Sequence, residues 1–315
     1  MYQSPSAKVR FFGNLRYDFK KNRFLLLLSA PAILWFLLFA YIPLIGLVIA
    51  FQKFSPARGV LGSEFIGLKN FEFFFKSEAF IRVTFNTLFL NALFIGSTMI
   101  FSIIIAIALS EINNYPFKRV TQSVVILPHF ISWTVVALLC EALFTVDRGL
   151  INQVIKILGN ESVPFYQSAD YWPGVLTALR IWQGAGYGSI IYLATITGFD
   201  KEMFEASRID GANRLQSLWH ITLPLLRPTA VILLLMSVGR IFNGDFGMIY
   251  AIIGNNTMLL PRTDVIDTYV YRQLMEASNI GMSSAVGLYQ SIMGFVMVLG
   301  ANALSRKLDA DSALF

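Results

Sequence analysis

Charged residues are scarce in this sequence. Of its 315 residues, 14% are Asp, Glu, Lys or Arg, whereas a soluble domain has about 25%. Hydrophobic residues make up 56%, above the usual range of about 45 to 50%. This composition excludes an ordinary soluble domain and indicates a chain that lies in a membrane.

Cysteine and histidine are also scarce. Cys140 is the single cysteine, so the chain forms no internal disulfide. The two histidines, His129 and His220, belong to no HExxH or paired-cysteine pattern, so we expect no metal site. The G-x-x-x-x-G at residues 62–67 is not followed by the Lys-Ser or Lys-Thr of a phosphate loop. We therefore expect no catalytic residue, cofactor or metal in this chain.

Long uncharged runs occur along the whole chain. A helix needs about 20 apolar residues to cross roughly 30 Å of hydrocarbon. Five uncharged runs meet or approach that length: residues 24–51, 83–110, 120–140, 181–199 and 277–305. A sixth segment starts at Pro228 and has 12 residues before Arg240, so we expect its helix to continue past that charge. The sequence predicts an all-α integral membrane protein with six transmembrane helices.

The distribution of Lys and Arg predicts how these helices are oriented. One side holds the tail 1–23, the loops 111–119 and 200–227, and the tail 306–315, with 14 basic and 8 acidic residues in all. The other segments hold 11 of each. Because basic loops stay on the cytoplasmic side, we expect both termini to be cytoplasmic. We assign this positive charge to contact with membrane lipid and not to nucleic-acid binding.

Two long loops are expected on the outer side. Residues 52–82 and 141–172 are rich in aromatic side chains, which favour the headgroup level, so we expect short interfacial helices there. We find no internal repeat of the kind that many secondary transporters contain, so that class of protein gains no support.

The loop 200–227 concentrates charge between two apolar segments. Asp200 and Glu202 place negative charge at the start of a helix expected from Lys201 to about Ile209. Asp210-Gly211 is expected to break this helix, with Asp210 capping a second helix from Ala212. We expect Pro224 and Pro228 to end the second helix and start the next span. Periodicity alone leaves two interpretations open: a helical pair lying on headgroups, or a docking element for a protein.

The residues of this loop resemble the EAA motif of ABC importer permeases. That motif reads approximately E-A-A, three residues, D-G-A, an apolar helix and L-P. The matching residues here are Glu205-Ala206-Ser207, Asp210-Gly211-Ala212 and Leu223-Pro224. Ser207 replaces the usual alanine, and Leu218 stands where an aromatic residue is common, with Trp219 beside it.

Three further segments, 127–132, 263–274 and 287–308, resemble the LplB-type polysaccharide and oligosaccharide permeases of the carbohydrate-uptake group. The resemblance implies a type I importer permease with a MetI-like core at 83–305, in the bacterial cytoplasmic membrane. It also implies a second homologous permease, two cytoplasmic ATPase subunits that bind ATP and Mg, an extracytoplasmic solute-binding protein and an oligosaccharide substrate.

The resemblance assigns ATPase coupling to the loop. Glu205 would pair with a basic residue of the ATPase, Gly211 would form the turn, and Leu218 and Trp219 would be buried in the ATPase. The full set of coupling residues is Glu205, Ala206, Ser207, Asp210, Gly211, Ala212, Leu218, Trp219 and Pro224.

Polar residues within the spans are candidates for the substrate path. They are costly in lipid and therefore face other helices or a wet cavity, and aromatic and amide side chains suit sugars. Each of them has the alternative role of holding helices together. Arg240 is the most informative, because a charge at that depth needs a partner or water, and an acidic sugar is one hypothesis for that partner. The candidates are Trp182, Gln183, Tyr187, Tyr192, Arg240, Asn243, Asp245, Tyr289 and Gln290.

Two other classes of function remain as alternatives to a permease. A membrane-embedded enzyme acting on lipid-linked sugars would require a catalytic carboxylate cluster and activity without an ATPase. A membrane scaffold or sensor would dock a partner without moving a solute.

Overall fold

The computed structural model describes residues 21–308, so most of the basic tail 1–23 and of the tail 306–315 lies outside the described residues. The regular structure of the described chain is helical apart from one hairpin of two short antiparallel strands, β1 (Gln52–Lys53) and β2 (Glu64–Phe65). This hairpin, which the sequence did not predict, closes the loop that follows the first span.

Within residues 21–308, four helices are long and apolar enough to cross a membrane. The first runs from Arg23 to Phe51 as α2 (Arg23–Phe36), η1 (Leu37–Tyr41) and η2 (Ile42–Phe51), where η denotes a π-helical or 3-10 helical segment. The others are α5 (Glu78–Ser110), the helix Arg214–Val238 and α16 (Ile280–Leu308). The first, second and last match the uncharged runs, because helices that face lipid must be apolar along their length.

The predicted third span is broken. It consists of α6 (Tyr115–Ile126), η3 (Leu127–Phe130) and α7 (Trp133–Phe144), with a bend of 92°. Pro128 lies at the break, and Ser132 caps α7 by accepting a hydrogen bond from the Val135 N–H. Counted as one span, this pair is a fifth candidate. His129 lies just before the break, and its ring stacks on that of Tyr187 with 4.1 Å between centroids.

Helix α9 (Trp172–Thr197) carries the predicted fourth span but is not among the apolar candidates. Its 26 residues lie against α5 and include buried polar and small residues such as Gln183 and Gly186. A Cβ on Gly186 would collide with the Val125 backbone, and one on Gly188 would lie 2.5 Å from Ser102 Oγ. These glycines therefore permit close helix packing. A helix surrounded by protein does not need a continuous apolar surface.

The predicted course of the fifth span was wrong at both ends. The helix does not continue past Arg240 but ends at Val238, and Arg240 lies in the turn that follows. The helix is instead longer at its N-terminal end, where α11 (Arg214–Ser217), η6 (Leu218–Thr222) and α12 (Leu223–Val238) are continuous. Pro224 and Pro228 lie inside this helix and do not end it.

The remaining helices are short. Helices α3 (Gly59–Gly62), α4 (Lys69–Lys76) and α8 (Leu150–Ile157), with η4 (Phe165–Gln167) and η5 (Ala169–Tyr171), lie in the two long loops, where short helices were expected. Helices α13 (Phe246–Ile253), α14 (Leu260–Thr263) and α15 (Ile266–Met275) connect the fifth span to α16. Helix α10 (Lys201–Ile209) precedes α11.

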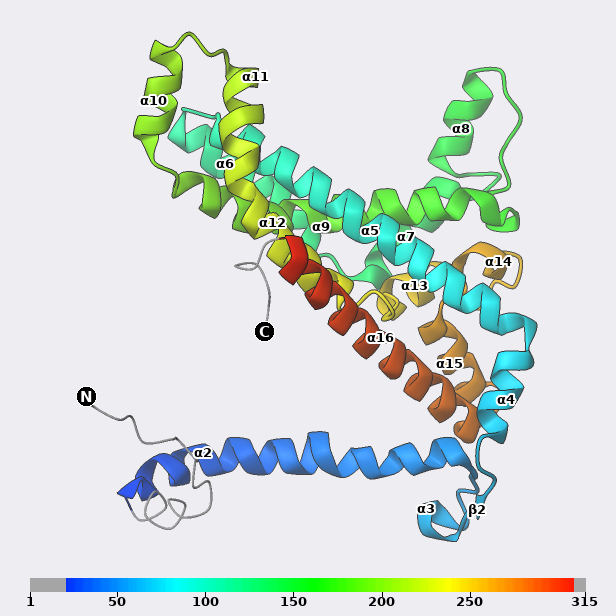
Figure 1. Ribbon diagram of the computed structural model, residues 1–315. Coiled ribbons are helices and arrows are strands. Elements are labelled where there is room, and N and C mark those ends of the chain that lie inside the picture. The colour runs from blue at the N-terminus through cyan, green and yellow to red at the C-terminus, as the bar shows by residue number, and fades with distance from the viewer. Residues whose placement is uncertain (1–20, 309–315) are drawn as a thin grey trace.

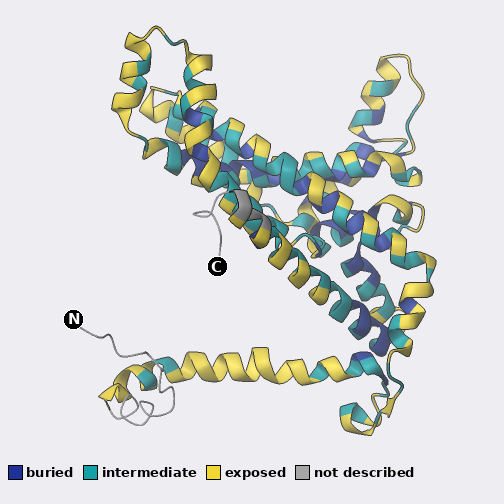
Figure 2. Ribbon diagram, in the orientation of Figure 1, coloured by how far each residue is buried: buried dark blue, intermediate teal, exposed yellow. Residues whose placement is uncertain are grey.

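The helices give the molecule two distinct ends (Figure 1). At one end, on the left of the figure, lie the start of α2 and the α10–α11 hairpin (Asp200–Thr222), and α16 runs from the right of the figure toward this end; we call it the hairpin end. Helices α4, α8 and α14 lie at the opposite end. Buried residues gather between α5, α9, α7 and α13, whereas α2 is exposed along its length (Figure 2). The loops 111–119 and 200–227 lie together at the hairpin end, which agrees with the Lys and Arg distribution that assigns them to one side of the membrane.

Candidate functional site: a charged hairpin and a membrane cavity

The first helix of the α10–α11 hairpin begins and ends where the sequence predicts. Asp200 is its N-cap, and Asp200 Oδ1 accepts a hydrogen bond from the Glu202 N–H at 3.0 Å. The negative charges of Asp200 and Glu202 lie at the positive end of the helix dipole. Helix α10 is therefore defined by local sequence.

The turn of the hairpin is formed by Gly211. Its φ is 84°, a left-handed conformation that favours glycine. The Gly211 N–H donates to the Arg208 carbonyl at 3.1 Å, and the Ala212 N–H donates to the Ser207 carbonyl at 2.9 Å. These two bonds form a Schellman motif, which satisfies the last carbonyls of α10.

Asp210 does not cap the second helix as expected. It is the C-cap of α10, and α11 begins at Arg214 with Asn213 as its N-cap. Asn213 Oδ1 accepts from the Gln216 N–H at 2.9 Å, and Gln216 Oε1 accepts from the Asn213 N–H at 2.8 Å. The sequence reading missed this capping box, although the Asn-x-x-Gln spacing was a signal for it.

The two helices of the hairpin are joined by their side chains. Ser207 Oγ lies 3.2 Å from Ser217 Oγ, within hydrogen-bond distance. Ser207 is the position at which this chain departs from the usual alanine of the motif. Here the hydroxyl links α10 to α11, and an alanine would lose that bond.

Several apolar side chains of the hairpin lie open to their surroundings. Ile209, Leu215 and Trp219 are 87%, 67% and 65% exposed, whereas Leu218 is half-buried. Glu205 is also exposed, and among residues 21–308 it makes no ion pair. The hairpin therefore presents an unpaired carboxylate and an apolar surface together.

The hairpin is attached to the spans by a continuous helix. Helix α11 continues through the π-helical segment η6 into α12, and Thr222 is buried at the junction. Arg214 also forms an ion pair of 3.5 Å with Glu111, which ends α5. A displacement of the hairpin would therefore be carried directly into the spanning part of the molecule.

A cavity of about 750 Å³ lies between α5, α9, α12 and the turn after α12. Five of the predicted path residues line it: Tyr187, Tyr192, Arg240, Asn243 and Asp245. Ser102, Tyr192 and Leu233 lie toward the hairpin end, and Arg180 and Asp245 lie toward the opposite end.

The structure places the other four predicted path residues outside this cavity wall. Gln183 Nε2 donates to the Ile131 carbonyl at 2.9 Å, at the break between η3 and α7. Tyr289 lies among Phe74, Phe75 and Phe80, and Trp182 is 42% exposed. For Gln183, Tyr289 and Gln290, the interhelical role fits these contacts; substrate contact by any of the four stays a prediction.

Two arginines line the cavity, and their surroundings differ. Arg180 Nη1 forms an ion pair of 2.9 Å with Asp245 Oδ2. Arg240 is exposed to the cavity, and within the described part of the chain no carboxylate pairs with it. The sequence reading missed Arg180 because the uncharged run was counted from residue 181, immediately after this charge.

Side chains of three helices, α5, α15 and α16, form hydrogen bonds to the turn that holds Arg240 and Asp245. Asn91 Nδ2 donates to the carbonyls of Ile241 at 2.9 Å and Asn243 at 3.2 Å. Gln290 Nε2 donates to the Phe242 carbonyl at 2.8 Å and to Asp267 Oδ2 at 3.0 Å. Burial raises the pKa of Asp267, while the hydrogen bonds from Gln290 and the Gly244 N–H act to lower it. Arg240 and Asp245 are thus presented on a rigid support.

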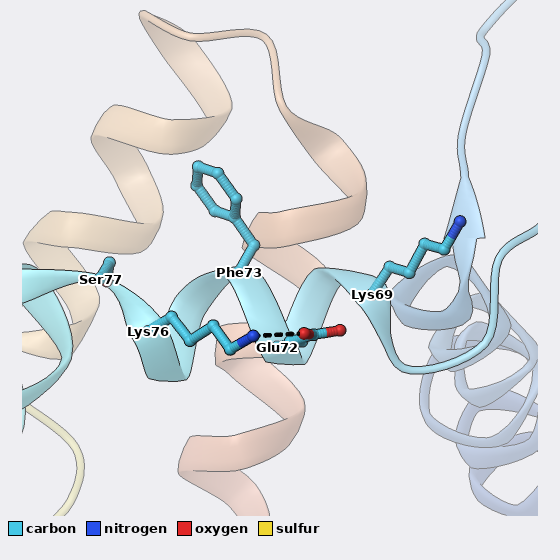
Figure 3. Close-up of a pocket in the computed structure, with 5 residues that line it drawn as sticks. All are labelled: Lys69, Glu72, Phe73, Lys76 and Ser77. Atoms are coloured by element: carbon cyan, nitrogen blue, oxygen red, sulfur yellow. Dashed lines mark hydrogen bonds and ion pairs between the residues drawn. The ribbon is translucent and has the colours of Figure 1, made fainter.

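A shallower hollow lies on the surface of α4 (Figure 3). Phe73 projects from this helix, and Lys76 Nζ pairs with Glu72 Oε1 at 2.6 Å on the exposed face. Residues of α4 and the adjoining Ser77 line this hollow, and none of the predicted path residues is among them. Within residues 21–308, no cluster of three or more His, Cys, Asp or Glu side chains is arranged to hold a metal ion.

Comparison with known proteins places the chain in one family. Residues 98–310 match the model of the binding-protein-dependent transport system inner membrane component. Protein LplB of Bacillus subtilis is 36% identical over 93% of this chain and 91% of its own length. The polygalacturonan/rhamnogalacturonan transport system permease protein YteP of the same organism is 37% identical over 91% of this chain and 89% of its own.

A solved structure has the same fold. It is a chain of a bacterial ABC transporter involved in the import of the acidic polysaccharide alginate, with a TM-score of 0.85 and 32% identity. The match covers 94% of this chain and 99% of that one. A second structure, with a TM-score of 0.84, holds that transporter in complex with an alginate pentasaccharide-bound periplasmic protein.

The expected all-α fold class and family are confirmed, and the alternative of a membrane-embedded enzyme gains no support. Of the six expected spans, four or five meet the criterion of length and apolarity within residues 21–308. The helices, the hairpin and the cavity belong to a subunit that moves a solute and not to one that transforms it. The chain belongs to the family of inner membrane components of binding-protein-dependent transport systems, the ABC importer permeases.

Proposed function

We propose that this chain is one of two permease subunits of an ATP-driven importer of oligosaccharides. The observation that carries the proposal is the α10–α11 hairpin, which has an unpaired Glu205 on α10 and an exposed Trp219 on the helix that continues unbroken into α12. Such a surface suits a cleft of a cytoplasmic ATPase subunit. In this account, closure of two ATPase subunits on ATP and Mg moves the hairpin and α12 together.

The proposal requires partners on both faces of the membrane. A second permease would complete the path, and an extracytoplasmic solute-binding protein would deliver the sugar at the end opposite the hairpin. Both termini and the hairpin would then be cytoplasmic, as the charge distribution favours. The complex of a similar transporter with a periplasmic binding protein supports this arrangement.

The test is reconstitution of the importer in proteoliposomes, with ATP hydrolysis measured as the loaded binding protein is added. Glu205→Lys reverses the charge that would enter the ATPase, so stimulated hydrolysis should fall on the order of tenfold or more. Glu205→Asp, which keeps the carboxylate at the same position, should retain most of that hydrolysis. Equal hydrolysis by the wild type and Glu205→Lys would contradict the coupling role.

An acidic oligosaccharide is the substrate that the cavity favours. Arg240 offers a cation without a carboxylate partner in the described chain, and two similar proteins are named for polygalacturonan and alginate. With oligogalacturonate as the probe, Arg240→Gln should raise the KM for uptake. Uptake unchanged in Arg240→Gln would remove this assignment and leave the importer proposal standing.

A further inference from the structure

The ion pair of Arg180 and Asp245 lies at the end of the cavity farther from the hairpin. It joins α9 to the first residue before α13, and both side chains line the cavity. Arg180 is 36% and Asp245 24% exposed, so neither charge is fully withdrawn from solvent. The pair therefore stands between the cavity and the end of the bundle that holds α8 and α14.

The two partners differ in their freedom to move. Asp245 Oδ1 caps α13 by accepting from the Met248 N–H at 3.1 Å, and the turn before Asp245 is held by Asn91 and Gln290. Asp245 is the one residue with which Arg180 forms an ion pair in the described chain. Because the carboxylate is fixed and the arginine side chain is long and flexible, opening the pair requires movement of Arg180.

We propose that this pair is an ionic gate, and that a carboxylate of the substrate opens it by taking Arg180 from Asp245. The inference rests on the proposed import of oligosaccharides and names the substrate class that this end of the path admits. Arg180 is then a specificity-determining residue, although in this structure its charge is paired with Asp245.

The chemistry of both groups permits the exchange. A guanidinium binds one carboxylate as well as another, so the charge-assisted hydrogen bonds to Arg180 are kept when the substrate replaces Asp245. A neutral sugar has no group that replaces that charge. Because the pair is partly exposed, breaking it costs much less than breaking a buried pair. Arg240, on the same cavity wall, offers a second cation for the next carboxylate of the chain.

Two variants separate a gate from a structural tie. Asp245→Asn removes the charge and keeps a side chain that caps helices equally well, so it frees Arg180. Arg180→Gln removes the cation itself. If the pair merely tied α9 to α13, both variants would lose the same contact and behave alike. A gate predicts that they differ.

The experiment uses the importer in proteoliposomes with its own ATPase and binding protein. Oligogalacturonate and its methyl ester are the acidic and neutral probes. Arg180→Gln should raise the KM for the acidic probe at least tenfold, and Arg180→Lys should recover part of that loss. Asp245→Asn should keep acidic uptake and raise ATP hydrolysis without binding protein at least threefold. Arg262→Gln, which breaks a pair of the same 2.9 Å with Asp170 away from the cavity, should change neither value.

The contrary outcomes are distinct. Equal loss of acidic uptake in Arg180→Gln and Asp245→Asn, or no change in either, would overturn the gate while the importer stands. Import of the methyl ester alone by the wild type would also overturn it. A wild-type complex whose ATP hydrolysis responds to no loaded binding protein would overturn both the gate and the proposed function.

Discussion

Asp264 has a fully buried side chain and is held by two arginines. Arg272 Nη2 lies 2.6 and 2.7 Å from its two oxygens, and Arg82 Nη2 lies 3.3 Å away. Asp245, Asp264 and Asp267 lie in the segment between the fifth and sixth predicted spans, and the sequence alone does not show which of them is buried. Arg82 is 182 positions away in the chain, and such a pairing depends on tertiary structure that a local pattern does not contain.

Removal of Arg272 should destabilise the protein strongly. Arg272→Ala leaves Asp264 buried with a weaker partner, so we expect the free energy of unfolding to fall by about 3 to 5 kcal/mol. The measurement is denaturant unfolding in detergent. Arg262→Gln breaks an ion pair whose side chains are both more than half exposed, and it should cost less than about 1 kcal/mol. Equal effects of the two changes would contradict the role of burial.

At the scale of single elements, the hairpin was the most predictable part of the molecule. Its first helix, its turn and its glycine follow from local sequence, because caps and left-handed turns depend on residues close in the chain. The prediction of the second helix was less accurate. Asn213 and not Asp210 caps its start, and the helix continues through the π-helical segment η6 and past Pro224. The coupling role of the hairpin residues stays a prediction.

The left-handed turn at Gly211 should be required for coupling. Gly211→Val forces a β-branched residue into φ of 84°, at a cost of about 1 to 3 kcal/mol. Space is not the obstacle, because a Cβ there meets no atom within 4 Å. We expect loss of stimulated ATP hydrolysis in Gly211→Val and retention in Gly211→Asn, since asparagine tolerates this conformation. Full hydrolysis in both variants would show that the turn geometry is not needed.

Close packing of α9 should be required for folding. Gly186→Val places side-chain atoms against the Val125 backbone of α6, which flexible side chains cannot relieve. We expect the yield of monodisperse protein in detergent to fall sharply. Gly174→Val makes the same change in the first turn of α9, where a Cβ meets nothing within 4 Å, and should be tolerated. Equal yields would mean that α9 and α6 do not depend on this contact.

At the scale of the whole molecule, run length predicted the helices that face lipid and was less accurate for those enclosed by protein. The spans starting near residues 24, 83 and 277 were placed well because an apolar surface is a physical requirement there. Helix α9 contains Arg180, and the third span bends by 92°. Enclosed helices satisfy their polar groups through neighbours, as Gln183 does with Ile131, and these contacts depend on the assembled fold.

The orientation of the molecule can be measured with cysteine labels. In a Cys140→Ser background, Lys156→Cys on α8 should react with an impermeant maleimide in intact spheroplasts. Lys201→Cys at the start of α10 should react after the membrane is opened. Both lysines are exposed, so access depends on sidedness. The reverse pattern would place the hairpin on the outer face and exclude its contact with a cytoplasmic ATPase.

The most direct test is photocrosslinking from the hairpin in native membranes. Trp219, 65% exposed, is replaced by benzoylphenylalanine, and the adduct formed under ultraviolet light is identified by mass spectrometry. We expect a crosslink to a nucleotide-hydrolysing subunit. Adducts with lipid alone would contradict it and would favour a hairpin that lies on the headgroups.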